Sequence, residues 1–213
     1  MEEINMSMMN KPRVVQKVRA FMKAVKANDN KVGTLPRSIV LNYNNICNFR
    51  CEFCFSAEED NAHIKDCLDL DTIRNLADQA DELGIWEIAL TGGELLVNLN
   101  KLYALIEVFK PERFQMVIIS NGYLITPTVA GELARRGIDC VGVSLSGMDA
   151  DKHSKERGGV KDAHKRALEA LDNVKAAGMT PWPNVIFGHH NSKDPDLYNI
   201  LDYAKEKTIQ LIL

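Results

Sequence analysis

Short apolar segments alternate with amphipathic segments from residue 38 to the end of the chain, and this alternation constrains the fold most strongly. The apolar segments cover residues 38–43, 86–91, 114–120, 140–146, 182–188 and 208–213, and helical patterns lie between them at 70–84, 99–110, 126–136, 161–178 and 194–207. Apolar strands that alternate with helices predict a parallel sheet with right-handed crossovers. Six such units are too few for a closed eight-fold barrel, so the α/β alternatives are an open doubly wound sheet and a partial barrel.

The residues before the first predicted strand form a separate segment. Residues 13–27 carry apolar side chains at helical spacing with lysines between them, which predicts an amphipathic helix. We therefore expect residues 1–35 to be an N-terminal helical extension with its linker, and residues 36–213 to be the core domain. The helix is expected to cover the edge of the sheet at the first strand. A basic helix could also grip a leader peptide, although most helices are scaffold.

The most unusual loops each follow one of the predicted strands. The sequence CNFRCEFC (47–54) follows the first strand, TGGE (91–94) the second, SNGY (120–123) the third and SLSG (144–147) the fourth, and Asn191 lies after the fifth. The carboxyl ends of parallel strands meet at one edge of a sheet, where the active sites of α/β folds lie. The sequence therefore predicts one functional site built from these loops.

Cysteine usage and charge narrow the class of protein. The chain has 213 residues, five cysteines and a net charge of −3. The N-terminus has no apolar secretory segment, and no apolar run approaches the roughly 20 residues of a membrane span. We therefore expect a cytoplasmic, reducing location without a disulfide framework, with no membrane association and no nucleic-acid partner.

Three of the five cysteines, Cys47, Cys51 and Cys54, lie within eight residues. That spacing favours a metal site over three buried, unligated thiols. Structural zinc takes four ligands, and His63, nine residues after Cys54, could be the fourth. An iron–sulfur cubane bound by three cysteines has one iron without a protein ligand, and that iron can bind a small molecule. Both alternatives stay open at this point, and the spacing favours the cluster.

Taken together, C-x3-C-x2-C after the first strand, GGE after the second, SNG after the third and the βα alternation resemble the radical S-adenosylmethionine (SAM) enzymes. The resemblance covers about residues 36–213 and is closest in pattern to peptide-modifying maturases and to molybdenum-cofactor cyclisation enzymes. It implies a partial (βα)6 TIM-like barrel, a [4Fe–4S] cluster and reductive cleavage of SAM to a 5′-deoxyadenosyl radical that abstracts a substrate hydrogen. It also implies an electron donor such as flavodoxin or ferredoxin, and a peptide, protein or small-molecule substrate in peptide or cofactor maturation.

The same resemblance assigns roles to individual residues. Cys47, Cys51 and Cys54 match the cluster ligands, and catalysis would run through them. The residues that match SAM contacts are Phe53, Gly92, Gly93, Glu94, Ser120, Ser144, Arg157 and Asn191. Glu94 would hold the methionyl ammonium and Arg157 the SAM carboxylate. The two glycines would let backbone approach the ligand closely.

Two of these assignments have ordinary structural alternatives, and the sequence also departs from the family pattern. Phe53, which would lie near the SAM adenine, could equally be a core residue, and Arg157 could be a solvated surface arginine. Leu95 follows GGE where the family often has Pro. Ser146 and Ser154 stand at positions where the family often has Asp. These departures do not touch the cysteines.

The chain ends within the sixth predicted strand, and the isolated Cys67 and Cys140 cannot supply a further cluster. The expectation is therefore either an enzyme with one cluster or a short form. An apolar edge at the sixth strand would need a second subunit, a partner protein or substrate to cover it. The functional alternative is an iron–sulfur electron-transfer or scaffold protein without SAM chemistry, and a third is a SAM-binding relic. GGE and SNG argue against an electron carrier, which needs no methionine-binding loop.

Overall fold

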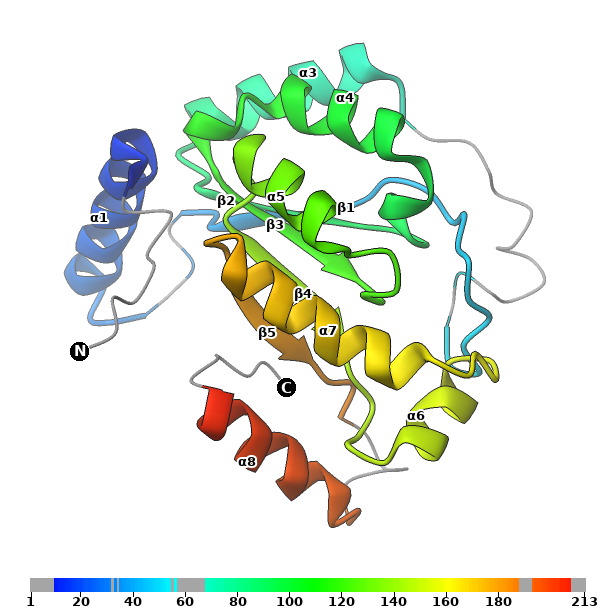
Figure 1. The fold of residues 1–213 in the computed structure, drawn as a ribbon. Helices are drawn as coiled ribbons and strands as arrows, with labels where there is room; N and C mark the ends of the chain where they lie inside the picture. The colour runs from blue at the N-terminus through cyan, green and yellow to red at the C-terminus, as the bar shows by residue number, and fades with distance from the viewer. Residues whose placement is uncertain are drawn as a thin grey trace.

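A computed structural model describes residues 10–31, 33, 35–54, 56, 68–187 and 193–207. Five parallel strands form one sheet in the order β1-β2-β3-β4-β5 (Figure 1). The strands are β1 (Ser38–Asn42), β2 (Glu87–Thr91), β3 (Gln115–Ser120), β4 (Cys140–Ser144) and β5 (Thr180–Asn184). Each strand lies beside the next one in the chain, whereas a doubly wound sheet reverses its strand order. The predicted α/β fold is confirmed, and its strand order is that of a partial barrel.

The helices lie between the strands as the sequence pattern predicts. They are α1 (Pro12–Ala27), α3 (Leu70–Glu82), α4 (Leu99–Phe109), α5 (Pro127–Arg135), α6 (Ala150–Glu156), α7 (Ala163–Ala176) and α8 (Asp196–Lys207), with the 3-10 turns η3 (Leu95–Asn98) and η4 (Pro111–Arg113). Their ends agree with the predictions to within about two residues, which is the usual uncertainty of helix ends. The predicted cap of α5 is present, because the Thr126 hydroxyl accepts a hydrogen bond from Val129 N and Pro127 follows at the first helical position.

The two faces of the sheet differ in how they are covered. On the outer face, residues such as Ile88 and Ile118 are fully buried in one large apolar core with α3, α4, α5 and α7. On the inner face, the buried cluster is small and consists of Val117, Cys140 and Trp182. Val40 lies in the same row of the sheet as Val117 but is 69% exposed. Most of the burial that stabilises the fold therefore lies between sheet and helices, and the inner face stays open beside β1.

The predicted fifth strand is present but its bounds differ, because β5 runs from Thr180 to Asn184 and the sequence pattern placed the strand at 182–188. Two prolines in this segment disfavour the prediction of a strand from sequence, because proline has no backbone N–H to donate to a neighbouring strand. Thr180 N donates to Asp139 O and Asn184 O accepts from Leu145 N, so alternate residues of β5 direct their polar groups to β4. Pro181 and Pro183 lie between them, and their nitrogens face the other side. The pairing with β4 is thus complete despite the prolines.

Two further differences concern the ends of the pattern. Helix α6 was not predicted, because its seven residues are too few and too polar for a helical apolar period, although Asp149 caps it by accepting from Lys152 N at 2.8 Å. The sixth strand predicted at 208–213 lies outside the described residues. Among the residues that the structure describes, no helix has the length and apolar character needed to cross a membrane.

Helix α1 lies at the end of the sheet where the strands begin (Figure 1), rather than along the β1 edge where it was expected. Lys11 Nζ reaches Asp139 Oδ2 at 2.5 Å and also donates to Phe114 O and Gly137 O. Lys17 Nζ donates to Ile85 O and to the carbonyl that precedes Phe114. These acceptors precede β2, β3 and β4, so the helix joins the starts of three strands. Its inward lysines therefore favour a scaffold role over leader-peptide binding.

Asp81, on α3, is the centre of the charge cluster beneath α1. Its side chain is 7% exposed, and it pairs with Arg13 at 2.5 Å, Lys17 at 2.7 Å and Arg113 at 3.7 Å. Lys17 and Arg113 are themselves more than nine-tenths buried. Burial lowers the pKa of Lys17, against the raising effect of Asp81. The carboxylate thus compensates two buried cations at once.

We expect Asp81→Asn to lower the free energy of unfolding by about 3 kcal/mol, because it leaves buried Lys17 without its carboxylate partner, whereas Arg113 keeps Asp78 at 2.7 Å. Urea unfolding of the purified chain measures the change. Asp71→Asn, on the same helix, is the matched control, since Asp71 is 86% exposed in its pair with Arg74 and should change stability by no more than about 0.5 kcal/mol. Equal stability of the two variants would contradict the structural role of Asp81.

Candidate functional site

The loops at the carboxyl ends of β1 to β4 meet at one end of the sheet, opposite α1 (Figure 1). The segment from Tyr43 to Cys54 follows β1, and Gly92-Gly93-Glu94 follows β2. Ser120 ends β3 and Asn121 follows it, and Ser144 ends β4. These loops therefore lie together as predicted, because all the strands run in the same direction. The contacts between them show how they are held together.

The three clustered cysteines lie in the loop after β1 as half-buried free thiols. Cys54 N donates to Cys51 O at 3.2 Å, which forms a tight turn between two of them. Burial raises the pKa of Cys47, and the neighbouring Glu94, Cys51 and Cys54 raise it further. The thiols are therefore within electrostatic reach of one another. They are not converged at coordination distance, since no three His, Cys, Asp or Glu side chains in the described part of the chain are arranged to hold a metal ion.

The two glycines after β2 allow the cysteine loop to contact them directly. Gly93 N donates to Asn44 O at 2.6 Å, and Glu94 N donates to Ile46 O at 2.7 Å. A Cβ on Gly93 would lie 2.1 Å from Ile46 O, and one on Gly92 would lie 2.5 Å from Asn44 O. No side chain fits at either position, because real Cβ atoms do not approach backbone that closely. The sequence predicted that backbone at these glycines would approach a ligand closely. In this structure it is the backbone of the cysteine loop that lies close to them.

Glu94 is buried, with 2% of its surface exposed, and its carboxylate is held by the end of β3. Its oxygens accept from Ser120 Oγ at 3.0 Å and from Asn121 N at 2.8 Å, and Oε1 also accepts from Leu96 N at 3.2 Å. Burial raises the pKa of Glu94, and these hydrogen bonds oppose the rise. No Lys, Arg or His among the described residues lies at ion-pair distance from it. Glu94 is thus a buried acid with hydrogen-bond donors but no counter-ion in the described part of the chain.

Asn121 extends this network to the cysteine loop. Its side-chain Nδ2 donates to Asn48 Oδ1 at 2.9 Å, and its Oδ1 accepts from Tyr123 N. Asn48 follows Cys47, whose Sγ lies 3.8 Å from the same Oδ1. Ser120 was predicted as a site residue, whereas Asn48 and Asn121 were not. Asn121 had a signal in the SNG motif, but Asn48 had none beyond its place beside a cysteine.

Arg157 is buried against the same loop, and the alternative of a solvated surface arginine is excluded. It is 4% exposed, and its Nη1 lies 4.0 Å from Cys51 Sγ. Its guanidinium carbon lies 5.1 Å from the centre of the Phe53 ring. The Nε and Nη2 atoms have no hydrogen-bond partner in the described part of the chain. A buried guanidinium is stabilised by an anion, and the described residues place none at ion-pair distance from it.

The end of α6 holds Arg157 in place against the cysteine loop. Glu52 N donates to Glu156 O at 3.3 Å. Gly158 has a φ of +79°, and a Cβ there would lie 2.5 Å from Arg50 O, so only glycine fits. One turn earlier, buried His153 accepts from Ser146 N at 3.1 Å through Nδ1. Burial, Arg157 and His164 lower the pKa of His153 to about 3, so it stays neutral.

The remaining predicted residues lie apart from this contact network or cannot be placed. Ser144 is half-buried and pairs in register with Asn184 of β5. Cys140 is buried on the inner face, where burial raises its pKa to about 11 and Gln115 Nε2 donates to it, so it is separate from the cysteine loop. Asn191, His63 and Cys67 lie outside the described residues.

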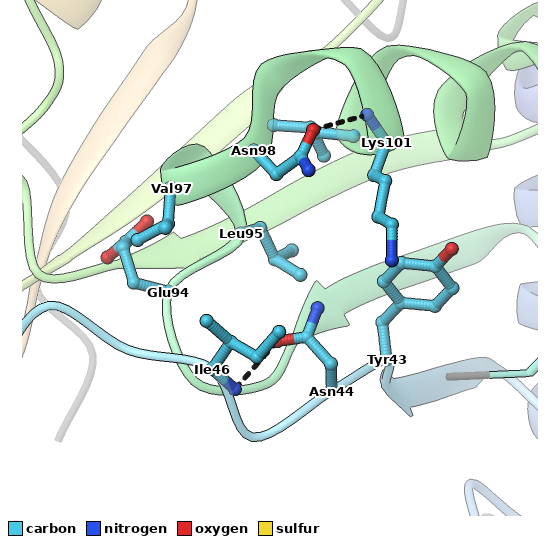
Figure 2. Close-up of a pocket in the computed structure, with 9 residues that line it drawn as sticks. Tyr43, Asn44, Ile46, Glu94, Leu95, Val97, Asn98 and Lys101 are labelled. Atoms are coloured by element: carbon cyan, nitrogen blue, oxygen red, sulfur yellow. Dashed lines mark hydrogen bonds between the residues drawn. The ribbon is translucent and has the colours of Figure 1, made fainter. Parts of the chain in front are cut away.

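A small pocket adjoins the site behind the cysteine loop (Figure 2). Figure 2 shows Tyr43, Asn44 and Ile46 on one side and the segment from Glu94 to Lys101 on the other. Asn44 Oδ1 accepts from Ile46 N, and Asn98 Oδ1 accepts from Lys101 N. Its volume of about 40 Å³ has room for about three water molecules. The pocket is therefore too small for a nucleoside ligand.

A family model and several curated proteins match this chain. The family described as the Radical SAM superfamily matches residues 41–204. GTP 3′,8-cyclase of Helicobacter pylori is 30% identical over 168 residues, and a probable GTP 3′,8-cyclase of Sulfurisphaera tokodaii is 32% identical over 162. These alignments cover 78% and 76% of this chain, and 51% and 50% of the relatives. The chain thus spans about half the length of the curated relatives it matches.

Solved structures of similar fold have lower sequence identity. Streptococcus suis SuiB bound to S-adenosylmethionine is 18% identical with a TM-score of 0.67, over 92% of this chain and 43% of that one. Native anSMEcpe with bound AdoMet is 19% identical with a TM-score of 0.62, over 83% of this chain and 51% of that one. At this identity the likeness concerns the fold, and it agrees with a TIM-like partial barrel.

The contact between Gly93 and the cysteine loop gives a direct test of the site's construction. We expect Gly93→Ala to lower the free energy of unfolding by about 1–3 kcal/mol, because the added methyl overlaps Ile46 O and forces the two loops apart. Thermal or urea unfolding measures the change.

The matched control is Gly131→Ala, which adds the same methyl group on α5. A Cβ at Gly131 meets no atom within 4 Å, and alanine in a helix is more favourable than glycine by about 0.5–1 kcal/mol. The two substitutions should therefore change stability in opposite directions. A Gly93→Ala protein as stable as the parent would mean that the two loops do not depend on this contact.

Proposed function

The chain belongs to the radical S-adenosylmethionine superfamily, and from this premise we propose that it holds a [4Fe–4S] cluster through Cys47, Cys51 and Cys54 and cleaves SAM reductively. Members of the superfamily carry a [4Fe–4S] cluster and use SAM. When bound, the cluster supplies the electron that splits SAM into methionine and a 5′-deoxyadenosyl radical, which abstracts a substrate hydrogen.

The observation that carries this proposal is a pair of buried, opposite charges beside the cysteine loop. Glu94 is close enough to raise the pKa of Cys47 by its charge and has no counter-ion among the described residues, and Arg157 lies next to Cys51 with two nitrogens that have no partner among those residues. An amino-acid zwitterion carries one ammonium and one carboxylate, so it would compensate both charges at once. SAM has such a zwitterion at its methionyl end. An electron carrier without SAM has no need of this arrangement.

The chemistry of the cysteines fits the cluster. Thiolates are the usual ligands of iron–sulfur clusters, and three of them leave one iron free for an exogenous ligand. The three thiols lie on one short loop, and metal binding commonly completes the ordering of such a loop. We propose that the loop converges around the cluster, since the glycine contacts and the Asn121–Asn48 hydrogen bond already fix its first half.

The other SAM contacts are proposed from the family pattern. Phe53, 39% exposed beside Arg157, is assigned to the adenine. The remaining proposed contacts are Gly92, Gly93, Ser120, Ser144 and Asn191. Gly92 and Gly93 keep a role through backbone atoms, because the cysteine loop already occupies the space of their missing side chains. Ser120 acts through Glu94, whose carboxylate it binds.

The substrate and partners are proposed from the printed names of similar proteins. The relatives named GTP 3′,8-cyclase act on a nucleotide, and SuiB and anSMEcpe have been solved with peptides bound. We propose a role in cofactor or peptide maturation, with one electron from a flavodoxin or ferredoxin in a reducing cytoplasm. The core domain is assigned to residues 36–213 and the extension to 1–35. A second subunit or partner protein is the proposed cover for the end of the sheet beyond β5.

The metal assignment is tested by anaerobic reconstitution. We expect about four irons per chain, and loss of the cluster when Cys47, Cys51 or Cys54 is changed to Ala. Cys140→Ala is the matched control, because Cys140 is buried on the inner face and hydrogen-bonded by Gln115. Iron and sulfide analysis with absorbance spectra gives the readout. Stoichiometric zinc in place of iron would overturn the assignment, as would cluster loss in the control.

The SAM assignment is tested at Glu94. A charge-assisted hydrogen bond to the methionyl ammonium contributes roughly 1.5–3 kcal/mol, so Glu94→Gln should weaken SAM binding by roughly ten- to a hundred-fold. The neutral amide removes the buried negative charge but keeps one oxygen for Asn121 N. Equilibrium binding of SAM to the reconstituted protein measures the effect, and iron content should stay at the parent level. Unchanged SAM affinity would remove Glu94 from the binding site.

A further inference from the structure

Arg157 contacts the sulfur of a cluster-ligand candidate and has two further buried nitrogens without a partner among the described residues. Its Nη1 lies 4.0 Å from Cys51 Sγ, within the range of an N–H···S hydrogen bond, although 106 residues separate the two in the chain. The Nε and Nη2 atoms point to no protein partner among the described residues. One face of the guanidinium is covered by the Phe53 ring. One nitrogen of the guanidinium therefore contacts a sulfur, and two others have no partner among the described residues.

The protein fixes this geometry from several sides. The end of α6 is joined to the cysteine loop by Glu52 N→Glu156 O and by the close packing of Gly158 on Arg50. The start of α6 is joined to the segment just before α8 by the ion pair of Lys152 with Asp194. These contacts tie the end of α6, which carries Arg157, to the residues on either side of Cys51. Among the described residues, no carboxylate forms an ion pair with the Arg157 guanidinium.

A fixed positive charge with a donor to a ligand sulfur changes the energy of adding an electron to the cluster. Reduction adds one negative charge to the cluster and its thiolates, and that charge is stabilised by a nearby cation and by hydrogen bonds to sulfur. In a buried site this stabilisation is screened less than in water. Hydrogen bonds to ligands and burial are the established means by which proteins tune such potentials.

We propose that Arg157 is a positioning residue that raises the reduction potential of the cluster through Cys51 Sγ. The inference rests on the proposed function, since it requires the cluster to be bound by Cys47, Cys51 and Cys54. The step is a one-electron reduction of [4Fe–4S]²⁺ to [4Fe–4S]⁺ by an external one-electron donor, with no bond made or broken in the protein. Arg157 holds the positive charge beside the sulfur, and its Nε and Nη2 atoms keep their capacity for an anion.

The test is a redox titration of the reconstituted full chain without SAM, followed by electron paramagnetic resonance of the reduced cluster. Arg157→Met removes the charge and the donors, and we expect it to be about ten-fold harder to reduce at a given potential, a downward shift of about 59 mV for a one-electron couple. Arg157→Lys keeps the charge and should restore part of the shift. Dithionite or a photoreductant supplies the electron.

The matched control is Arg50→Met, which removes an arginine from the same loop. Arg50 Nη1 donates to Cys47 O and Phe49 O and is exposed, so it contacts carbonyls and not sulfur. Its removal should change the ratio of reduced to oxidised cluster by less than about two-fold. Equal midpoints for the two methionine variants would overturn the inference. So would loss of the cluster in both Arg157→Met and Arg157→Lys, because that result would make Arg157 a structural residue.

Failure of this inference and failure of the proposed function give different results. A parent chain that binds no iron on reconstitution refutes the function. A parent chain that binds iron, with a midpoint that does not depend on Arg157, refutes only the role of Arg157. Because SAM is absent from the titration, the readout does not depend on turnover.

Discussion

The contact between the cysteine loop and the two glycines after β2 is the constraint on which the site depends. Asn44 O and Ile46 O lie where the side chains of Gly92 and Gly93 would be, so the loop after β1 and the loop after β2 form one unit. Glu94 extends the unit to β3 through Ser120 and Asn121. The loop that carries the cysteines is therefore anchored to the ends of three strands. Residues held by rigid elements are positioned more precisely than residues on a loop alone.

Both ends of the sheet contain buried charged side chains, but only at one end are these charges paired among the described residues. At the end where the strands begin, Asp81 compensates Lys17 and Arg113, and the cluster ties α1 and η4 to α3. At the carboxyl end, Glu94 and Arg157 stay without counter-ions among the described residues. Uncompensated buried charge costs stability, and proteins retain such strain chiefly where a ligand relieves it. The scaffold end and the ligand end are thus distinguished by whether their charges are paired.

Much of the fold was predictable from the sequence, because the spacing of apolar residues, the helix-capping residues and the order of the loops all indicated the same α/β arrangement. Thr126 and Pro127 marked the start of α5, and the loops with cysteine and GGE fell at the predicted edge. The site residues came from family resemblance, and periodicity alone would not have found Arg157. Its contact with Cys51 depends on α6, which is too short to leave an apolar pattern. Asn48 was missed because a single polar loop residue carries no spacing signal.

The prolines of β5 have a consequence for the mechanics of the sheet. Pro181 and Pro183 turn their nitrogens away from β4, so the side of β5 that faces away from β4 offers carbonyl acceptors but lacks two donors. Any strand that joins this edge can form only about half of the hydrogen bonds of a regular parallel ladder. That junction would then be a seam of low tensile strength in an otherwise continuous sheet. The sheet would part there first.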